Sequence, residues 1–227
     1  VFTSALRAGN WLTLQGLEIM AMLAAAALGA IFSLLLSFAS INLKADQTIG
    51  GTALNLMAPA LVLFLVRVLA NQNTLQMATG DAASWFMIKK STFGIKKNVD
   101  IGFLGETFLH KVYLATYICI IIFVVLSVIL YTTRFGLRLR SCGEHPQASA
   151  SVGINVQKMR YSGVLISGLL GGLGGIVYIT AGVSVWKFEN GVAGFGFLAL
   201  AVMIFGAWHP LKIALAALLF GFFRALG

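Results

Sequence analysis

Charged residues are scarce in this chain of 227 residues. Only 10% are Asp, Glu, Lys or Arg, whereas 59% are apolar, and the mean hydropathy is +0.93. A soluble domain carries about 25% charged residues, so this composition excludes that class. Apolar runs of around twenty residues recur, and each is long enough to cross a hydrocarbon core about 30 Å thick as a helix. Short alternating segments, typical of a membrane barrel, are not the pattern here.

Residue patterns for catalysis and metal binding are also lacking. Cys119 lies inside an apolar run and Cys142 in a polar segment, so a disulfide between them is not expected, and no metal-site spacing is present. The sequence contains no Gly-x-x-x-x-Gly-Lys-Ser/Thr phosphate loop, no His-Glu-x-x-His and no nucleophile with partners at a telling spacing. We therefore predict that the chain is not an enzyme and binds no metal or cofactor.

The net charge of +9 raises the possibility of a nucleic-acid partner. The basic residues, however, stand at the ends of apolar runs or in one loop, without a continuous basic face or a nucleic-acid motif. Phospholipid headgroups and membrane topology explain the charge better. We expect the lipid bilayer as a partner, and no nucleic acid.

The apolar runs predict an all-α membrane protein, a polytopic bundle of about five to six spans. It forms a single transmembrane domain over residues 1–227, which we expect to be incomplete at both ends because it begins in a loop-like segment and stops directly after an apolar run. The predicted spans cover residues 17–43, 48–68 and 112–133, the stretch after Arg160, and the short runs 192–208 and 211–226. The last two runs form either two spans or a re-entrant pair. His209 at their junction is expected to lie at headgroup level rather than in a proton relay.

The second span is polar in its first half. Gly50, Gly51 and Pro59 are expected to unwind or kink it, and Asn55 places an amide within the membrane, where an unpaired polar group is costly. Interhelical hydrogen bonding with tight packing is the favoured interpretation. The alternative is that Thr52 and Asn55 face a solvated substrate path.

Two long connections differ in their charge. Residues 70–111 contain five lysines among aromatic residues, and we predict an extracytoplasmic loop, either solvated with headgroup anchors or a docking surface. Residues 134–160 carry several arginines at the start of the segment and Lys158 with Arg160 at its end. Their density places this loop in the cytoplasm by the positive-inside tendency, although the margin over the lysine-bearing loop is modest.

Small residues recur every four positions after Arg160, which places them on one face of a helix. Such a face lets another helix approach closely, and Gly168 with Gly172 forms a second small-xxx-small step beside it. A dinucleotide-binding glycine loop is excluded because Gly172-Leu-Gly174 lacks the last glycine of that pattern and follows no strand. The residues of the predicted packing face are Gly163, Ser167, Gly171 and Gly175.

Three stretches resemble ABC importer permeases of the branched-chain amino acid and simple-sugar superfamily, which have the type II importer fold. They are 135–163 with its Gly-Glu-His-Pro, Gly50-Gly-Thr-Ala-Leu-Asn-Leu, and 196–210. The Gly-Glu-His-Pro form is most similar to the nucleoside-uptake branch, which works with binding lipoproteins of the basic membrane protein type. The chain departs from the family at Phe195, where arginine or tyrosine is common, and at His209, where asparagine is common.

The resemblance implies that Glu144 to Gly153 form the coupling helix, which sits in a groove of a separate ATPase subunit. Pro146 suits a first helical turn, Glu144 suits the helix dipole, small residues allow close docking, and Gly153 suits a helix end. An ordinary interhelical loop is the alternative. The implied coupling residues are Glu144, His145, Pro146, Ala148 and Gly153.

The resemblance also implies a nucleoside permease subunit in a bacterial cell membrane, with ATP and Mg bound by the partner ATPase. A sibling permease in a heterodimer and a substrate-binding lipoprotein are the other expected partners. Nucleosides would cross between the two permeases past Thr52, Asn55 and Phe197. The alternatives are a permease for simple sugars or another small polar solute, an assembly subunit, or an ion-coupled secondary transporter. The last is disfavoured because the acidic residues considered fall near span ends or in loops: Glu18, Asp46, Glu144 and Glu189.

Overall fold

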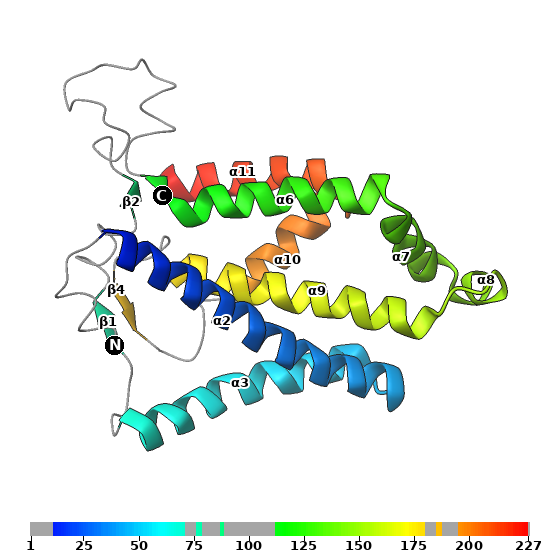
Figure 1. Cartoon of the computed structure of the whole chain (residues 1–227), viewed down its shortest axis with the longest axis horizontal. Helices are drawn as coiled ribbons and strands as arrows, with labels where there is room; N and C mark the ends of the chain where they lie inside the picture. Colours follow the sequence, from blue (N-terminus) through cyan, green and yellow to red (C-terminus); the bar gives the residue numbers. More distant parts are fainter. Residues whose placement is uncertain are drawn as a thin grey trace, which may run out of the picture. The chain divides into compact units, whose positions relative to one another are not determined.

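The computed structural model describes residues 11–70, 76–78, 87–88, 112–179, 185–187 and 195–226 (Figure 1). Helices account for nearly all of these residues, so the prediction of an all-α membrane protein is confirmed. The helices are α2 (Trp11–Ser37), continued by the π-helix η1 (Phe38–Asn42), α3 (Gln47–Ala70), α6 (Leu114–Thr132), α7 (Arg134–Glu144), α8 (Pro146–Ser151), α9 (Val156–Val177), α10 (Phe195–Phe205) and α11 (Pro210–Leu226).

The chain divides into two compact units, residues 1–187 and 188–227, which are described separately. The first unit holds the four described helices long and apolar enough to cross a membrane, at residues 18–42, 47–68, 115–132 and 156–177. In the second unit, α10 has 11 residues and α11 has 17, fewer than the roughly 20 that a crossing typically needs. The described residues thus supply four spans of full length, and the other predicted crossings depend on the α10–α11 pair.

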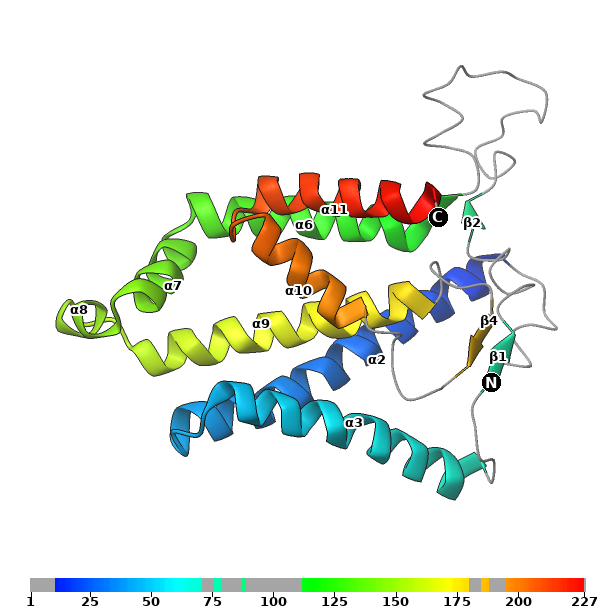
Figure 2. The ribbon, with the colours of Figure 1, turned by 180° about the vertical axis from the view of Figure 1, so that it is seen from behind.

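The closest helix pair in the first unit is α2 with α9, which run antiparallel and cross (Figure 2). A Cβ atom on Gly29 would lie 3.0 Å from the backbone nitrogen of Gly172, and one on Gly172 would meet the carbonyl group of Ala25. The two backbones are therefore in contact, as small residues permit. On α2, the buried residues that follow the same face are Glu18, Met22, Ala26, Ser33 and Ser37.

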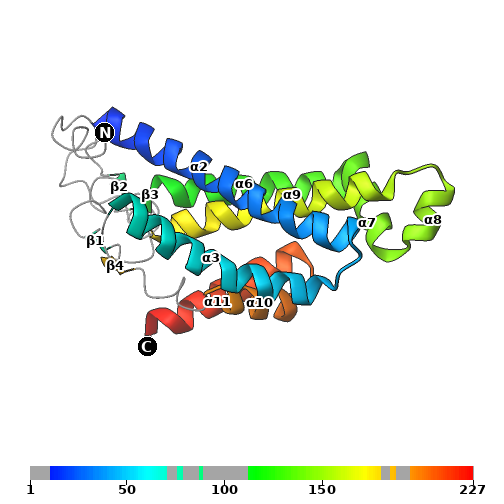
Figure 3. The ribbon, with the colours of Figure 1, turned by 90° about the horizontal axis from the view of Figure 1, so that it is seen from below.

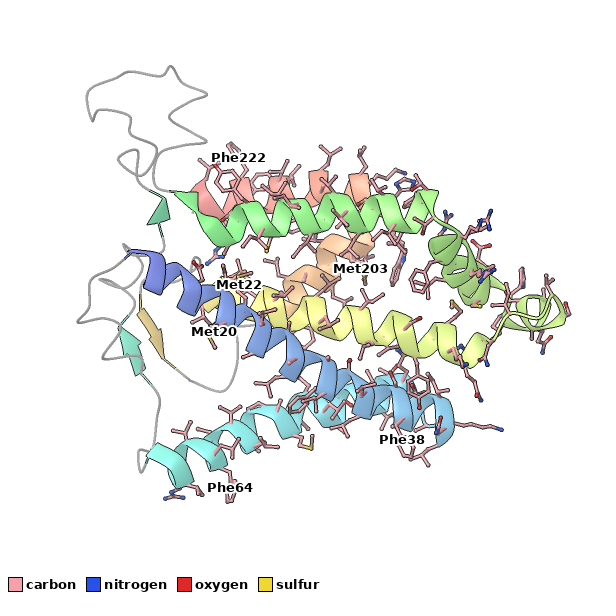
Figure 4. All side chains as sticks on the ribbon, viewed as in Figure 1. Met20, Met22, Phe38, Phe64, Met203 and Phe222 are labelled. Atoms are coloured by element: carbon pink, nitrogen blue, oxygen red, sulfur yellow. The ribbon has the colours of Figure 1, made fainter. Side chains whose placement is uncertain are left out.

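Most large apolar side chains lie on the outside of the helices. In each of the four described spans, at most 11% of the residues in the apolar stretch are buried. Leu56 on α3 is 76% exposed, and Figure 4 shows Phe38 and Phe64 directed away from the helix axes. Lipid tails are as apolar as these side chains, so this pattern suits a membrane bundle with lipid or another subunit around it.

Short strands pair the connections between helices, at the end of the first unit opposite to α8. Strand β1 (Gln76–Ala78) pairs antiparallel with β4 (Val185–Lys187), and β2 (Met87–Ile88) pairs with β3 (Val112–Tyr113). These pairs were not predicted. They bring the connection after α3 beside the connection after α9, as alternating spans require. Most of 70–111 lies outside the described residues, so its extracytoplasmic placement stays a prediction.

The polar first half of the second span is helical, so the expected unwinding at Gly50 and Gly51 is wrong. Helix α3 runs without a break from Gln47 to Ala70 and includes Pro59. Its first turn is capped by Asp46, whose carboxylate Oδ1 accepts from the backbone N–H groups of Thr48 at 2.7 Å and Ile49 at 3.3 Å. These hydrogen bonds, led by that of Thr48, hold the pKa of the Asp46 carboxyl below its usual value.

The second unit contains a tight reversal between α10 and α11. Ala207 and Trp208 have positive φ angles of 47° and 61°, which non-glycine residues seldom adopt. A Cβ atom on Gly206 would lie 2.7 Å from the Cα of Ile213, so only glycine allows α11 to fold back so closely. The packed pair explains how two short apolar runs lie together within this unit.

Candidate functional site

The segment between α6 and α9 is helical rather than an open loop. At its start, Thr133 caps α7, and its hydroxyl accepts a hydrogen bond from the backbone N–H of Gly136 at 3.3 Å. Gly136 is buried, and a Cβ atom there would meet the backbone carbonyl groups at the end of α6. This glycine permits the corner from which α7 and α8 leave the spans (Figure 1).

Helix α8 is shorter than the predicted coupling helix and has six residues. His145 precedes it without a side-chain cap, and Pro146 occupies its first position, where the missing N–H costs nothing. The chain turns after α8 through Gly153, which has a φ of +84°, and its N–H donates to the carbonyl of Ala150 at 3.0 Å. A positive φ in this turn is the expected use of glycine after a helix.

Glu144 lies outside α8, which corrects the predicted start of the coupling helix. It is the last residue of α7, where a negative charge opposes the helix dipole, and its side chain is exposed. His145 and Ala148 are also exposed, Val152 is 80% exposed, and Ser149 is buried. The α8 segment therefore presents small and polar groups outward while Ser149 holds it against the chain.

Two of the predicted path residues, Thr52 and Asn55, lie on α3 in the first unit, and the third, Phe197, belongs to the second unit. Thr52 is exposed on α3, and its hydroxyl donates to the carbonyl of Ile49 at 2.9 Å, within its own helix. Asn55 is exposed one turn further along. Phe197 lies on α10 in the second unit and is 75% exposed. All three are accessible, and their role in a substrate path stays a prediction.

The predicted packing face of α9 is only partly used within the chain. Gly163 faces α7, where its Cβ would lie 3.1 Å from Leu139, whereas nothing stands within 4 Å of a Cβ on Gly171 or Gly175, and Ser167 is exposed. The close contact with α2 uses the neighbouring step of Gly168 and Gly172. Periodicity identified both glycine rows but not the row that meets α2, and a packing role for Ser167, Gly171 and Gly175 stays a prediction.

Glu18 was predicted to lie near the end of a span, and the first described span begins at this residue; its burial was not predicted. Helix α2 begins at Trp11, so Glu18 lies two turns inside it and is 2% exposed, with no hydrogen-bond partner for either carboxylate oxygen in the described part of the chain. The sequence signal for its burial is the spacing with Met22 and Ala26, which places all three on the face toward α9.

The sequence profile described as "Branched-chain amino acid transport system / permease component" matches residues 1–227. The chain belongs to this family. It is thus a multi-pass membrane protein with a permease fold.

Individual relatives agree with this family. The chain is 41% identical over 207 residues to the nucleoside ABC transporter permease protein NupC of Lactococcus lactis, and 42% identical over 207 residues to the guanosine ABC transporter permease protein NupQ of Bacillus subtilis. Each match covers 91% of this chain and 62% of the relative, so the chain spans less than two thirds of their length. Both are named as permease subunits, a class that is not itself catalytic. No solved structure matches the chain with significance.

Proposed function

We propose that this chain forms half of a translocation path for nucleosides, as a permease subunit of an ATP-driven importer in a bacterial cell membrane. The observation that carries the proposal is the identity of 41% and 42% to two permeases named for nucleosides and guanosine, over 91% of the chain. The four helices of crossing length and the helical segment between α6 and α9 support it.

Helix α8 is the proposed contact with a separate ATPase subunit, which would bind ATP and Mg. Three properties suit it to docking: it is short, it stands between two longer helices, and its exposed side chains are small at Ala148 and Ala150. A small surface lets a partner groove close around the helix. Because α7 packs on both α8 and α9, a displacement of α8 would be carried to the spans.

A sibling permease is the proposed partner across the path, with a substrate-binding lipoprotein on the other side of the membrane. The chain also resembles NupB of Lactococcus lactis, another nucleoside ABC transporter permease protein, at 32% identity over 103 residues. One organism thus holds two related permeases, NupB and NupC, which supports a heterodimer. The largely exposed apolar faces of the spans leave room for such a neighbour.

The test of the substrate class is competition uptake in cells that express the complete transporter. We expect unlabelled nucleosides to suppress entry of labelled guanosine, and free bases, pentoses and glucose to leave it unchanged. Cells that lack only this chain provide the baseline. Suppression by glucose alone would favour the sugar alternative, which a 28% identity to the putative glucose permease TsgC13 of Haloferax volcanii brings into consideration.

An ion-coupled transporter is the second candidate, and Glu18 is the observation that favours it. Glu18 is the first residue of the first described span, buried and without a hydrogen-bond partner among the described residues, and a buried carboxylate in a spanning helix often marks an ion or proton path. A protonophore separates the two candidates. We expect uptake to persist when the proton gradient collapses and ATP is maintained, and the Glu18→Gln variant to respond in the same way. Loss of uptake with the gradient alone would support the ion-coupled candidate.

A further inference from the structure

A pocket of about 470 Å³ opens in the first unit, where the turn between α2 and α3 meets α7 and the start of α9. Figure 3 shows α7 next to the start of α9. The size is that of an ordinary small-molecule site. Its lining residues come from all three segments: Ser40, Ile41, Ala45 and Gln47, then Leu139, Cys142 and Gly143, then Arg160, Gly163 and Val164.

The pocket lies at the ends of described spans, where the boundary of a membrane is expected. The first span ends at Asn42, the second begins at Gln47, and the fourth begins at Val156, so the turn and the lining part of α9 lie at the ends of three spans. The hydroxyl of Tyr161 donates to the amide oxygen of Asn42 at 3.0 Å and ties α9 to η1 at this level. Headgroups of phospholipids occupy the same depth.

Arg160 gives the pocket a free cationic group. It forms no hydrogen bond or ion pair with the residues that the structure describes, whereas Arg140 lies over the ring of Tyr131 at 4.7 Å. A guanidinium carries five N–H donors in a planar fork that matches a phosphate. Residues 134–160 hold five basic residues and one acidic residue, so the surrounding potential favours an anion.

The nearby acidic groups do not line the pocket. Asp46 stands between Ala45 and Gln47, but its carboxylate caps α3 through the N–H groups of Thr48 and Ile49. Glu144 follows Gly143 and is exposed at the end of α7. The guanidinium of Arg160 is thus left without a carboxylate that would compete with a bound anion.

Part of the pocket wall is apolar, formed by Ile41, Leu139 and Val164 with the buried Cys142, while Ser40 and Gln47 add polar groups. A free inorganic anion gains nothing from such walls, whereas an acyl chain does. We propose that this pocket binds an anionic phospholipid, with the phosphate on Arg160 and the upper part of an acyl chain against the apolar wall. Such a lipid would bridge the α2–α3 turn to α7, next to the segment that carries α8.

The test uses the complete transporter, purified in detergent and titrated with phosphatidylglycerol or phosphatidylcholine of identical acyl chains. Bound lipids are counted by native mass spectrometry, and a photoreactive phosphatidylglycerol is mapped to peptides. We expect tighter binding of phosphatidylglycerol and crosslinks to peptides that contain 139–143 or 160–164. Arg160→Gln should weaken the binding of phosphatidylglycerol about fivefold, the effect of one basic residue at a lipid surface, and leave phosphatidylcholine unchanged.

Two further variants keep the test decisive. Lys158→Gln removes a charge two residues away that does not line the pocket, and it should leave the mapped crosslink intact. Gly163→Leu keeps every charge, and its side chain extends beside Leu139 into the pocket, so it should lower the crosslink yield. The proposal is overturned if Arg160→Gln and Lys158→Gln have equal effects, if both lipids bind equally, or if inorganic phosphate displaces the lipid at equal concentration.

Discussion

The contact between α2 and α9 makes a quantitative prediction at Gly172. A Cβ atom there would lie 2.8 Å from the carbonyl carbon of Ala25, whereas ordinary contact begins at 3.4 Å. The two helices must therefore move apart by at least about 0.6 Å, and a longer side chain demands more. Because both partners are backbone, no rotamer change relieves the overlap. Gly172→Leu should thus cost about 1–3 kcal/mol, the usual range for overpacking.

The assay is thermal unfolding of the purified full-length protein in detergent, followed by size-exclusion chromatography with fluorescence detection. We expect Gly172→Leu to lower Tm by about 5 °C. Gly171→Leu is the matched control, since it adds the same side chain one residue away, where a Cβ has nothing within 4 Å. Equal loss of Tm in both variants would refute the packing register, because helix propensity or lipid exposure would then explain the effect.

Three other predictions follow from local geometry. Ala148→Trp on the exposed α8 should lower uptake about tenfold, which corresponds to ~1.4 kcal/mol of docking free energy, while membrane insertion is retained. Gln157→Trp is the control, at an exposed position on α9. Equal uptake in both variants would argue against docking at α8. Folding lowers the pKa of the Asp46 carboxyl, so its contribution to stability is present above the unfolded pKa of about 3.9 and is lost as pH falls through the lower folded value. Asp46→Asn should therefore make Tm fall less steeply as pH is lowered through this range. An unchanged profile of Tm against pH would contradict the role of Asp46 as the cap of α3. Gly206→Ala should destabilise the α10–α11 turn by about 1–3 kcal/mol, because the added Cβ atom would meet the backbone of Ile213. A Tm equal to that of the native protein would contradict this prediction.

The positions of the spans could be predicted well because hydrophobic length is a local property. Residues 112–133 were predicted as one span, and α6 covers Leu114–Thr132. Pro59 was less predictable. Its ring suggests a break, but a proline within a membrane span is tolerated where neighbouring groups satisfy the freed backbone carbonyl, and α3 continues through it.

The detailed geometry of the candidate site exceeded what the sequence could predict. Glu144 and Pro146 lie two positions apart, yet the first ends α7 and the second begins α8, because His145 between them precedes a proline and leaves the helical region, with φ −137° and ψ 84°. The burial of Glu18 was not predicted, because the contact between α2 and α9 that covers this face joins segments distant in sequence. The pocket at Arg160 was also invisible, because its walls come from three segments distant in sequence.

The most direct test of the central claim is transport by the reconstituted complete complex, in which this chain is joined by its permease, ATPase and binding-protein partners in sealed proteoliposomes. Labelled guanosine and labelled glucose are offered in turn, with ATP supplied on the side of the ATPase. The account predicts ATP-dependent accumulation of guanosine and none of glucose. Accumulation of guanosine that does not depend on ATP, or of glucose in its place, would contradict it.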